Sequence, residues 1–417
     1  MTRPPPIQAS LDGERAVGPR TRELIDLRLG QRQEVSARFF GVEAERIAKL
    51  CHRMAERFAR GGRLIATGLS PAARSDVRHV AVEFVHPVIV GKRALPALGL
   101  TGESTGVAHE LALTAEPEDI VIVFGEPGEG PELAAAVATA RSRGCLTIAF
   151  SGLDAEWVFE PPSEDPLVRQ ELVETLYHVL WELVHVFFEH RGLLEGRTER
   201  RSHDAGASSF LYPFLAERED DLDAVLADVR GSALMKADEV QALRVATLHG
   251  ATAILADAAA ATRRSFESGG RLLALGNGGS ATDAADAVAD FAGPPAVFGW
   301  RPRRALDLCA DTAIITAIAN DIGTEAIFAR QIIAYGRAGD VLLAFSTSGN
   351  SLSVLDALAE ARRRDLVTVA LVGYDGGRVA ADRLADHIVV TPSQHIPRIQ
   401  EAQATAYHVL RELVELG

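Results

Sequence analysis

The stretch from Val341 to Ser351 reads VLLAFSTSGNS, and it indicates the fold of the whole chain. Its first five residues are apolar or small, which is typical of a strand buried in a parallel sheet. Small hydroxyl side chains follow, and a helical pattern then runs from Leu352 to Arg364. Hydroxyl groups and unpaired backbone N–H groups at a helix start can bind a phosphate group, although a serine-rich cap without a ligand is the ordinary alternative.

A second loop upstream supports the phosphate interpretation. The sequence from Arg271 to Leu275 predicts another short strand, and GNGGS at 276–280 then opens a helix of small residues. Parallel strands end at the same edge of a sheet, so we expect the two loops to face each other. A dinucleotide fingerprint is a weaker interpretation of the same glycines, because no acidic residue ends a second strand at the expected distance.

The C-terminal half, from about Val240 to Leu416, resembles the sugar isomerase (SIS) domain of sedoheptulose-7-phosphate isomerases. The resemblance is carried by four blocks: GNGGSATDA at 276–284, ADTAIITAIANDIG at 310–323, GDVLLAFSTSGNS at 339–351 and RIQEAQATAYHVL at 398–410. It implies a sugar-phosphate site that contains Asn277, Gly278, Gly279, Ser280, Asp311, Ser346, Thr347, Ser348 and Ser351.

The N-terminal half repeats this pattern. ERFARGGRLIATG at 56–68 matches RSFESGGRLLALG at 264–276, and DIVIVF at 119–124 matches DVLLAF at 340–345. Strands that alternate with helices predict two tandem α/β SIS domains, each a parallel sheet flanked by helices in a flavodoxin-like or Rossmann-like three-layer sandwich. We expect a disordered N-terminus at 1–20, the first domain at 21–190, a linker with a possible helix at 191–232, and the second domain at 233–417.

A metal site is implied by the same resemblance. In the family, a His and a Glu four residues apart on one helix, with a Gln and a His eight apart on the last helix, bind zinc, and the Glu is also the proton-transfer base. Such spacings place each pair on one helix face. The N-terminal copy has all four as His79, Glu83, Gln170 and His178, where the resemblance makes Glu83 and His178 catalytic. The equivalent positions of the C-terminal copy are Asp286, Asp290, Gln400 and His408.

The phosphate loop shows the opposite pattern of loss. GEPGEG at 125–130 replaces STSGNS in the N-terminal copy, and Glu126 and Glu129 would repel a phosphate. Complementary losses favour one working site composed across two packed copies. The N-terminal copy would provide the metal ligands and the base, and the C-terminal copy would provide the substrate-binding residues. Either Gln/His pair could complete it; the N-terminal pair is favoured, and Gln400 and His408 then contact substrate. The two aspartates at 286 and 290 are either remnants or a carboxylate-rich second site.

Isomerisation of a ketose to an aldose needs a base beside C1 and stabilisation of an oxyanion, tasks that suit Glu83 and a zinc ion. The resemblance therefore implies conversion of sedoheptulose 7-phosphate to D-glycero-D-manno-heptose 7-phosphate through an enediol. The alternative is a non-catalytic SIS regulator or scaffold that binds a sugar phosphate, since some family members keep only the fold.

Composition limits the remaining possibilities. The 417 residues carry a net charge of −14 and show no basic stripe, so nucleic acid is not an expected partner. The three cysteines lie far apart, as in a reduced cytoplasmic protein, and no segment predicts a signal sequence or a membrane span. The family typically forms tetramers of single domains, so the resemblance implies a homodimer that rebuilds a pseudo-tetramer.

Overall fold

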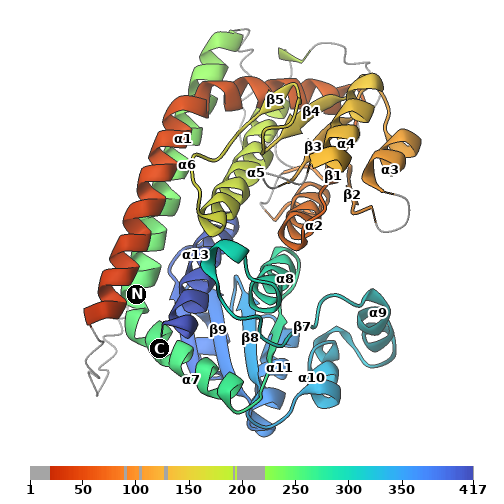
Figure 1. Cartoon of the computed structure of the whole chain (residues 1–417). Coiled ribbons are helices and arrows are strands. Elements are labelled where there is room, and N and C mark those ends of the chain that lie inside the picture. The colour runs from red at the N-terminus through yellow and green to blue at the C-terminus, as the bar shows by residue number, and fades with distance from the viewer. Residues whose placement is uncertain are drawn as a thin grey trace, which may run out of the picture.

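The computed structural model describes residues 19–88, 92–102, 106–125, 130–190, 193–194 and 221–416. These residues form two α/β units, which lie one above the other in Figure 1. The first unit contains, in chain order, α1 (Pro19–Ala59), β1 (Leu64–Thr67), α2 (Pro71–Val85), β2 (Ala97–Leu100), α3 (Val107–Thr114), β3 (Ile120–Val123), α4 (Gly130–Ser142), β4 (Leu146–Ala149), β5 (Trp157–Val158) and α5 (Pro166–Glu189).

The second unit repeats this alternation after two long helices. Its elements are α6 (Leu222–Gly250), α7 (Thr252–Glu267), β6 (Leu272–Leu275), α8 (Gly279–Ala292), the short 3-10 helix η3 (Ala296–Phe298), β7 (Ala305–Asp307), α9 (Thr312–Asp321), the short 3-10 helix η4 (Thr324–Ala326), α10 (Ala329–Tyr335), β8 (Val341–Ser346), α11 (Leu352–Arg363), β9 (Val367–Gly373), α12 (Gly377–Ala381), β10 (His387–Thr391) and α13 (Ile396–Glu415).

Both units contain a five-stranded parallel sheet with the same strand order. The order is β2-β1-β3-β4-β5 in the first and β7-β6-β8-β9-β10 in the second. The central register also matches, since Leu64 pairs with Ile120 in one sheet and Leu272 pairs with Val341 in the other. Strands β1, β3 and β8 are buried along their whole length, as expected for parallel strands covered by helices on both faces. The predicted fold of two tandem α/β domains is confirmed.

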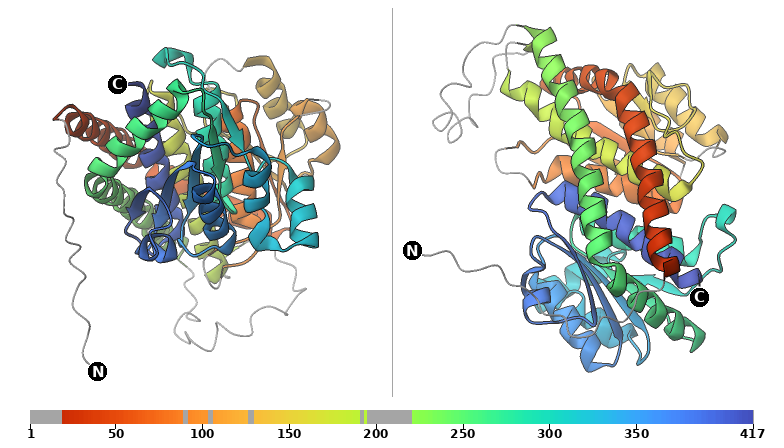
Figure 2. Two further views of the ribbon diagram at one scale, coloured as in Figure 1. Left: turned by 90° about the horizontal axis from the view of Figure 1, so that it is seen from below. Right: turned by 90° about the vertical axis from the view of Figure 1, so that its left-hand side faces the viewer.

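Two long helices connect the cores of the units. Helix α1 begins beside the second unit, where Ile25 and Leu29 pack into its hydrophobic core. Helix α6 begins beside the first unit, where Val225 and Val229 pack into that unit's core. The right-hand view of Figure 2 shows α1 and α6 running side by side over much of their length. Each core is therefore completed by a helix from the other half of the chain, which holds the two units together.

The sequence-based boundaries are partly outside the described residues. Residues 1–18, most of the predicted disordered N-terminus, are not described, and Pro19 already begins α1. Of the predicted linker at 191–232, only 193–194 and 221–232 are described, and α6 starts within it at Leu222. Within the described part of the chain, no helix is long and apolar enough to cross a bilayer.

Four helices form the junction between the units. In Figure 1, α2 and α5 of the first unit face α8 and α13 of the second. The pair α2 and α8 is joined by a hydrogen bond of 2.9 Å, which the hydroxyl of Ser75 donates to the carbonyl oxygen of Thr282. The predicted metal and base residues all lie on these four helices, so this packing decides which of them meet.

Candidate functional site

His79 and Glu83 lie on α2, where both side chains are no more than 3% exposed. The helix starts at Pro71 after Ser70, whose hydroxyl accepts a hydrogen bond from the Ala73 N–H, a favoured helix cap. Four residues separate the histidine from the glutamate, so they share one face, with His79 Nε2 3.9 Å from Glu83 Oε1. The other carboxylate oxygen of Glu83 has no hydrogen-bond partner.

His178 of α5 meets His79 directly. The two Nε2 atoms are 3.3 Å apart, and the Nδ1 atom of each ring is occupied by another group. His79 Nδ1 shares a hydrogen bond of 2.8 Å with the Tyr177 hydroxyl, whereas His178 Nδ1 donates to Glu401 Oε1 over 2.9 Å. Such bonds fix the orientation of an imidazole so that its remaining nitrogen points at a ligand. Tyr177 and Glu401 were not predicted from the sequence, although each is next to a predicted site residue.

The amide at this site belongs to Gln400 of α13. Its Nε2 lies 3.1 Å from His79 Nε2, and its Oε1 has no partner. Rotating the amide by half a turn exchanges these two atoms and presents the oxygen to the histidines. Gly279, the first residue of α8, packs closely against this amide, since a Cβ atom there would lie 2.0 Å from the Gln400 Nε2. The structure does not bring Gln170 to this place.

The four side chains fit a zinc-like metal ion. Ligand atoms of His79, Glu83 and His178 all lie within 4.8 Å of one another. Two nitrogens bound to one tetrahedral zinc at about 2.0–2.1 Å would be separated by about 3.3–3.4 Å, which agrees with the histidine geometry. Burial lowers the pKa of His178 to about 3 and that of His79 well below its usual value, so both rings are neutral. Burial, together with Glu182 and Glu401, raises the pKa of Glu83 to about 8.

His408 lies in a second cluster rather than beside His79. Its Nδ1 donates to Glu171 Oε1 over 2.7 Å, and its Nε2 faces Asp290 Oδ2 at 3.4 Å. This repeats the contact between His178 and Glu401 with the helices exchanged, because α5 and α13 cross in opposite directions. Gln400 and His408 therefore lie in different clusters, which their spacing within one helix could not reveal.

The predicted phosphate loops lie together in the second unit. The Asn277 amide donates to the Ser353 hydroxyl over 2.9 Å, which joins the GNGGS loop to the start of α11. Ser346 Oγ accepts a hydrogen bond from the Gly349 N–H over 3.1 Å. Gly349 has φ +62°, and a Cβ atom there would be 2.2 Å from the Gly376 carbonyl oxygen, so only glycine fits the turn. Ser351 precedes α11 and makes no capping bond with its own side chain.

Neighbouring residues link the phosphate loops to the metal residues. A Cβ atom on Gly373 would lie 2.3 Å from the Thr347 carbonyl oxygen and 2.6 Å from the Ile399 side chain. Ile399 directly precedes Gln400, and Gly279 of the GNGGS loop touches both Gln400 and His79. The loop region therefore lies next to the histidine cluster, which is formed by His79, Glu83, His178 and Gln400. The other predicted residues of this group, Gly278, Ser280 and Ser348, lie in the same two loops.

Asp311 takes a different place from the rest. Its carboxylate caps α9 by accepting a hydrogen bond of 3.0 Å from the Ile314 N–H, and the residue is exposed. Its role in substrate binding stays a prediction. The prediction about Glu126 and Glu129 lies outside the described residues.

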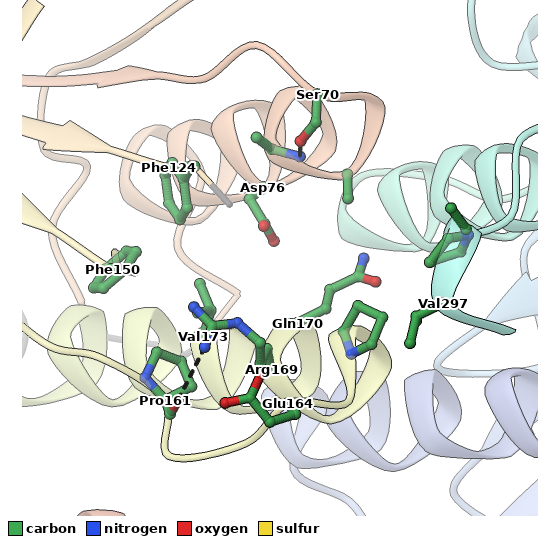
Figure 3. A pocket seen from close by; sticks show the side chains of 16 residues that line it. Ser70, Asp76, Phe124, Phe150, Pro161, Glu164, Arg169, Gln170, Val173 and Val297 are labelled. Atoms are coloured by element: carbon green, nitrogen blue, oxygen red, sulfur yellow. Dashed lines mark hydrogen bonds between the residues drawn. The ribbon is translucent and has the colours of Figure 1, made fainter. Parts of the chain in front are cut away.

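Gln170 lines a pocket of about 320 Å³ at the edge of the first unit. Figure 3 shows this pocket, with Asp76 and Gln170 pointing toward its centre and Phe124 and Phe150 on its apolar side. Its walls also include Pro295, Ala296 and Val297 from the second unit. Neither His79 nor His178 lines this pocket, so the pocket is separate from the site where Gln400, the repeat counterpart of Gln170, meets the two histidines.

Comparisons with known proteins identify a family for part of the chain. The profile of the family described as SIS domain matches residues 237–373. The chain is 43% identical over 164 residues to the phosphoheptose isomerase of Pelobacter propionicus, a match that covers 39% of this chain and 84% of that protein. It is 40% identical over 193 residues to the phosphoheptose isomerase of a Bradyrhizobium strain, covering 43% of this chain and 94% of the relative.

Solved structures resemble the whole chain at lower identity. The C-terminal domain of glucosamine-fructose-6-phosphate aminotransferase from Francisella tularensis has a TM-score of 0.55, 9% identity, and coverage of 94% of this chain and 95% of that structure. Tagatose-6-phosphate ketose/aldose isomerase from Escherichia coli has a TM-score of 0.52, 14% identity, and coverage of 94% and 92%. At these identities the likeness shows a common fold only.

Proposed function

This chain belongs to the SIS-domain family of phosphoheptose isomerases and is a sugar-phosphate isomerase, and from that premise we propose that it converts sedoheptulose 7-phosphate to D-glycero-D-manno-heptose 7-phosphate. One observation carries the proposal. His79, Glu83 and His178 of the first unit meet Gln400 of the second beside the loop that begins α8. A single site composed of both units explains why neither copy keeps a full set of family residues.

Glu83 is the proposed base. The reaction removes a proton from C1 of the ketose, forms an enediol and returns a proton to C2. Without a metal ion, burial raises the pKa of Glu83 to about 8, and a cation bound beside it would lower that pKa, so that the carboxylate could take a proton near neutral pH and give it back. One oxygen of Glu83 faces His79 and the other has no partner, so the latter is free to accept this proton.

The metal ligands in this proposal are His79, Glu83, His178 and Gln400, with Gln400 in the place first assigned to Gln170. A zinc ion bound there would polarise the carbonyl group and stabilise negative charge on the enediol oxygens. His178 serves to hold the metal rather than to shuttle the second proton, because its Nδ1 is bonded to Glu401 and its Nε2 faces His79.

The phosphate group is proposed to bind where β8 leads into α11. The first N–H groups of α11 have no partners within the helix, and the helix dipole favours an anion there. Hydroxyl groups of Ser346, Thr347, Ser348 and Ser351 add donors that carry no charge. Held at the far end of a seven-carbon sugar, the phosphate would orient C1 and C2 toward Glu83.

The test is turnover of sedoheptulose 7-phosphate by the full chain, with and without added zinc. Replacing the base by Glu83→Gln is expected to lower kcat by about 10²–10⁴-fold. The matched control is Asp290→Asn, at the equivalent position of the repeat, which should stay within about tenfold of wild type. If Asp290→Asn abolishes turnover and Glu83→Gln does not, the second unit works alone and the composite site is wrong.

A wild-type protein that binds the sugar phosphate without turning it over would instead support a non-catalytic regulator or scaffold. We also propose that the chain forms a homodimer, as the family's tetramers of single domains suggest. Light scattering on the purified protein would then give twice the chain mass of 44.6 kDa.

A further inference from the structure

Three buried carboxyl groups lie at the junction of α5 and α8, beside the proposed zinc ligands but outside that set. They belong to Glu174, Asp283 and Asp286, which are 5%, 2% and 8% exposed. One oxygen of each, namely Glu174 Oε1, Asp283 Oδ2 and Asp286 Oδ1, has no hydrogen-bond partner. We call these three residues the acidic junction. Buried polar atoms are normally satisfied, so three orphaned oxygens in one place need an explanation.

The acidic junction is compact. Ligand atoms of Glu174 and Asp283 lie within 4.8 Å of each other and of a His79 nitrogen. Asp286 follows Asp283 by three residues on α8, which places it on the same helix face. Burial, followed by repulsion from surrounding carboxylates, raises the pKa of all three groups well above the usual range. Carboxylates as close together as those of Glu174 and Asp283 repel each other when ionised, unless a positive charge lies between them.

The basic side chains nearest to the acidic junction form their ion pairs with other acids, although Arg244 also interacts electrostatically with Glu174. Arg32 and Arg244 pair with Glu171, and Arg398 pairs with Glu401. Among the residues that the structure describes, no arginine or lysine forms a salt bridge with the acidic junction. An unpaired buried charge costs several kcal/mol, so this arrangement requires either protons or a cation.

The repeat shows that the fold does not need one of these acids. Aligning Gln170 with Gln400 and His178 with His408 places Glu174 opposite Ala404 of α13, which is also buried. An alanine fills the equivalent helix position without difficulty. Glu174 is therefore an added charge at the interface and not a requirement of helix packing.

One carboxylate of the 320 Å³ pocket lies near the acidic junction. Asp76 lines the 320 Å³ pocket, and Figure 3 shows its carboxylate pointing into that space. The same carboxylate is close enough to raise the pKa of both Glu174 and Asp286. Asp76 therefore adds a further carboxylate close to the acidic junction.

We propose that the acidic junction binds a second divalent cation, in addition to the metal ion of the histidine cluster. Its oxygen ligands favour a hard ion such as Mg²⁺ or Mn²⁺, whereas the two imidazoles of the first site favour zinc. This second site goes beyond the proposed isomerase reaction and does not depend on it.

The experiment uses the full chain, stripped of metal, loaded with one equivalent of Zn²⁺ and titrated with Mn²⁺. Electron paramagnetic resonance of free Mn²⁺ measures binding, and wild type is expected to bind one Mn²⁺ per chain. Glu174→Ala, which installs the residue of the other repeat, should weaken that binding by about tenfold or more. The matched control is Glu164→Ala, an exposed acid on the wall of the same pocket, which should leave binding unchanged.

Two further variants separate the alternatives. Asp286→Asn should weaken Mn²⁺ binding as Glu174→Ala does, and it replaces that variant if the latter does not fold. Glu83→Gln should lose zinc and turnover but keep Mn²⁺. The proposal is overturned if wild type binds Mn²⁺ no more tightly than Glu174→Ala, or if Glu83→Gln abolishes Mn²⁺ binding. Mn²⁺ binding without turnover of sedoheptulose 7-phosphate would overturn the proposed reaction alone.

Discussion

Gly279 offers a way to disturb the proposed metal site without disturbing the fold. It is the first residue of α8, and a Cβ atom there would lie 2.0 Å from the Gln400 Nε2 and 2.7 Å from the His79 Nε2. Gly279 is not among the described glycines with positive φ, so alanine can adopt its backbone conformation. In Gly279→Ala the ends of the Gln400 and His79 side chains would therefore move, and the backbone would not.

The size of the effect follows from these distances. Ordinary contact between nonbonded heavy atoms is about 3.5 Å, so the Gln400 amide must retreat by about 1.5 Å. Misplacement of about 1 Å near a reacting centre can cost about 100-fold in rate. Alanine is favoured over glycine in helices by about 0.5–1 kcal/mol, which offsets part of the contact strain. We expect a loss of about 100-fold in kcat/KM, zinc affinity lower by about tenfold or more, and a Tm within about 4 °C of wild type.

The assay compares zinc affinity, by competition with a chelating dye, with turnover and thermal unfolding. Gly231→Ala is the matched control, because Gly231 is exposed on α6 and has no atom within 4 Å of an added Cβ. This control should gain helix stability and keep wild-type zinc affinity. If Gly279→Ala binds zinc and turns over substrate as wild type does, Gln400 and His79 do not form the working site.

Three other results are expected. Gln400→Leu should lower zinc affinity about tenfold or more, while Gln170→Leu leaves it unchanged; equal effects in chelator competition would contradict the assignment. Glu171→Leu leaves the buried Arg32 guanidinium without its partner, so it should lower the free energy of unfolding by about 3–5 kcal/mol. Urea titrations measure this change, and a loss below about 1 kcal/mol would show that the ion pair is not needed for stability. Burial raises the pKa of Glu171, but Arg32, His408 and Arg244 together lower it by more, so the net pKa is well below 4.5. The stability from this carboxylate should be complete above about pH 5 and decline as the pH falls below 4.5, and a difference between wild type and Glu171→Gln that stays constant down to pH 3 would refute this.

Local patterns were sufficient to predict the fold and the positions of the two glycine-containing loops. Buried parallel strands are continuous apolar runs, and a glycine turn before a helix is recognisable because few residues fit the backbone there. Gly349 illustrates this, since its positive φ and the nearby Gly376 carbonyl exclude any side chain. The repeat was visible because both sheets use the same strands in the same order.

The sequence by itself determined that His79 and Glu83 share a helix face, because they are four residues apart, and it predicted a metal site there. Only the tertiary structure decided which amide joins them. A spacing of eight shows that Gln400 and His408 share a face of α13, but it does not show what that face meets along its length. Because α5 and α13 cross in opposite directions, the start of α13 lies beside His178 and its later turns lie beside Glu171. Gln400 therefore lies in the histidine cluster with residues of the other unit, and His408 lies outside that cluster.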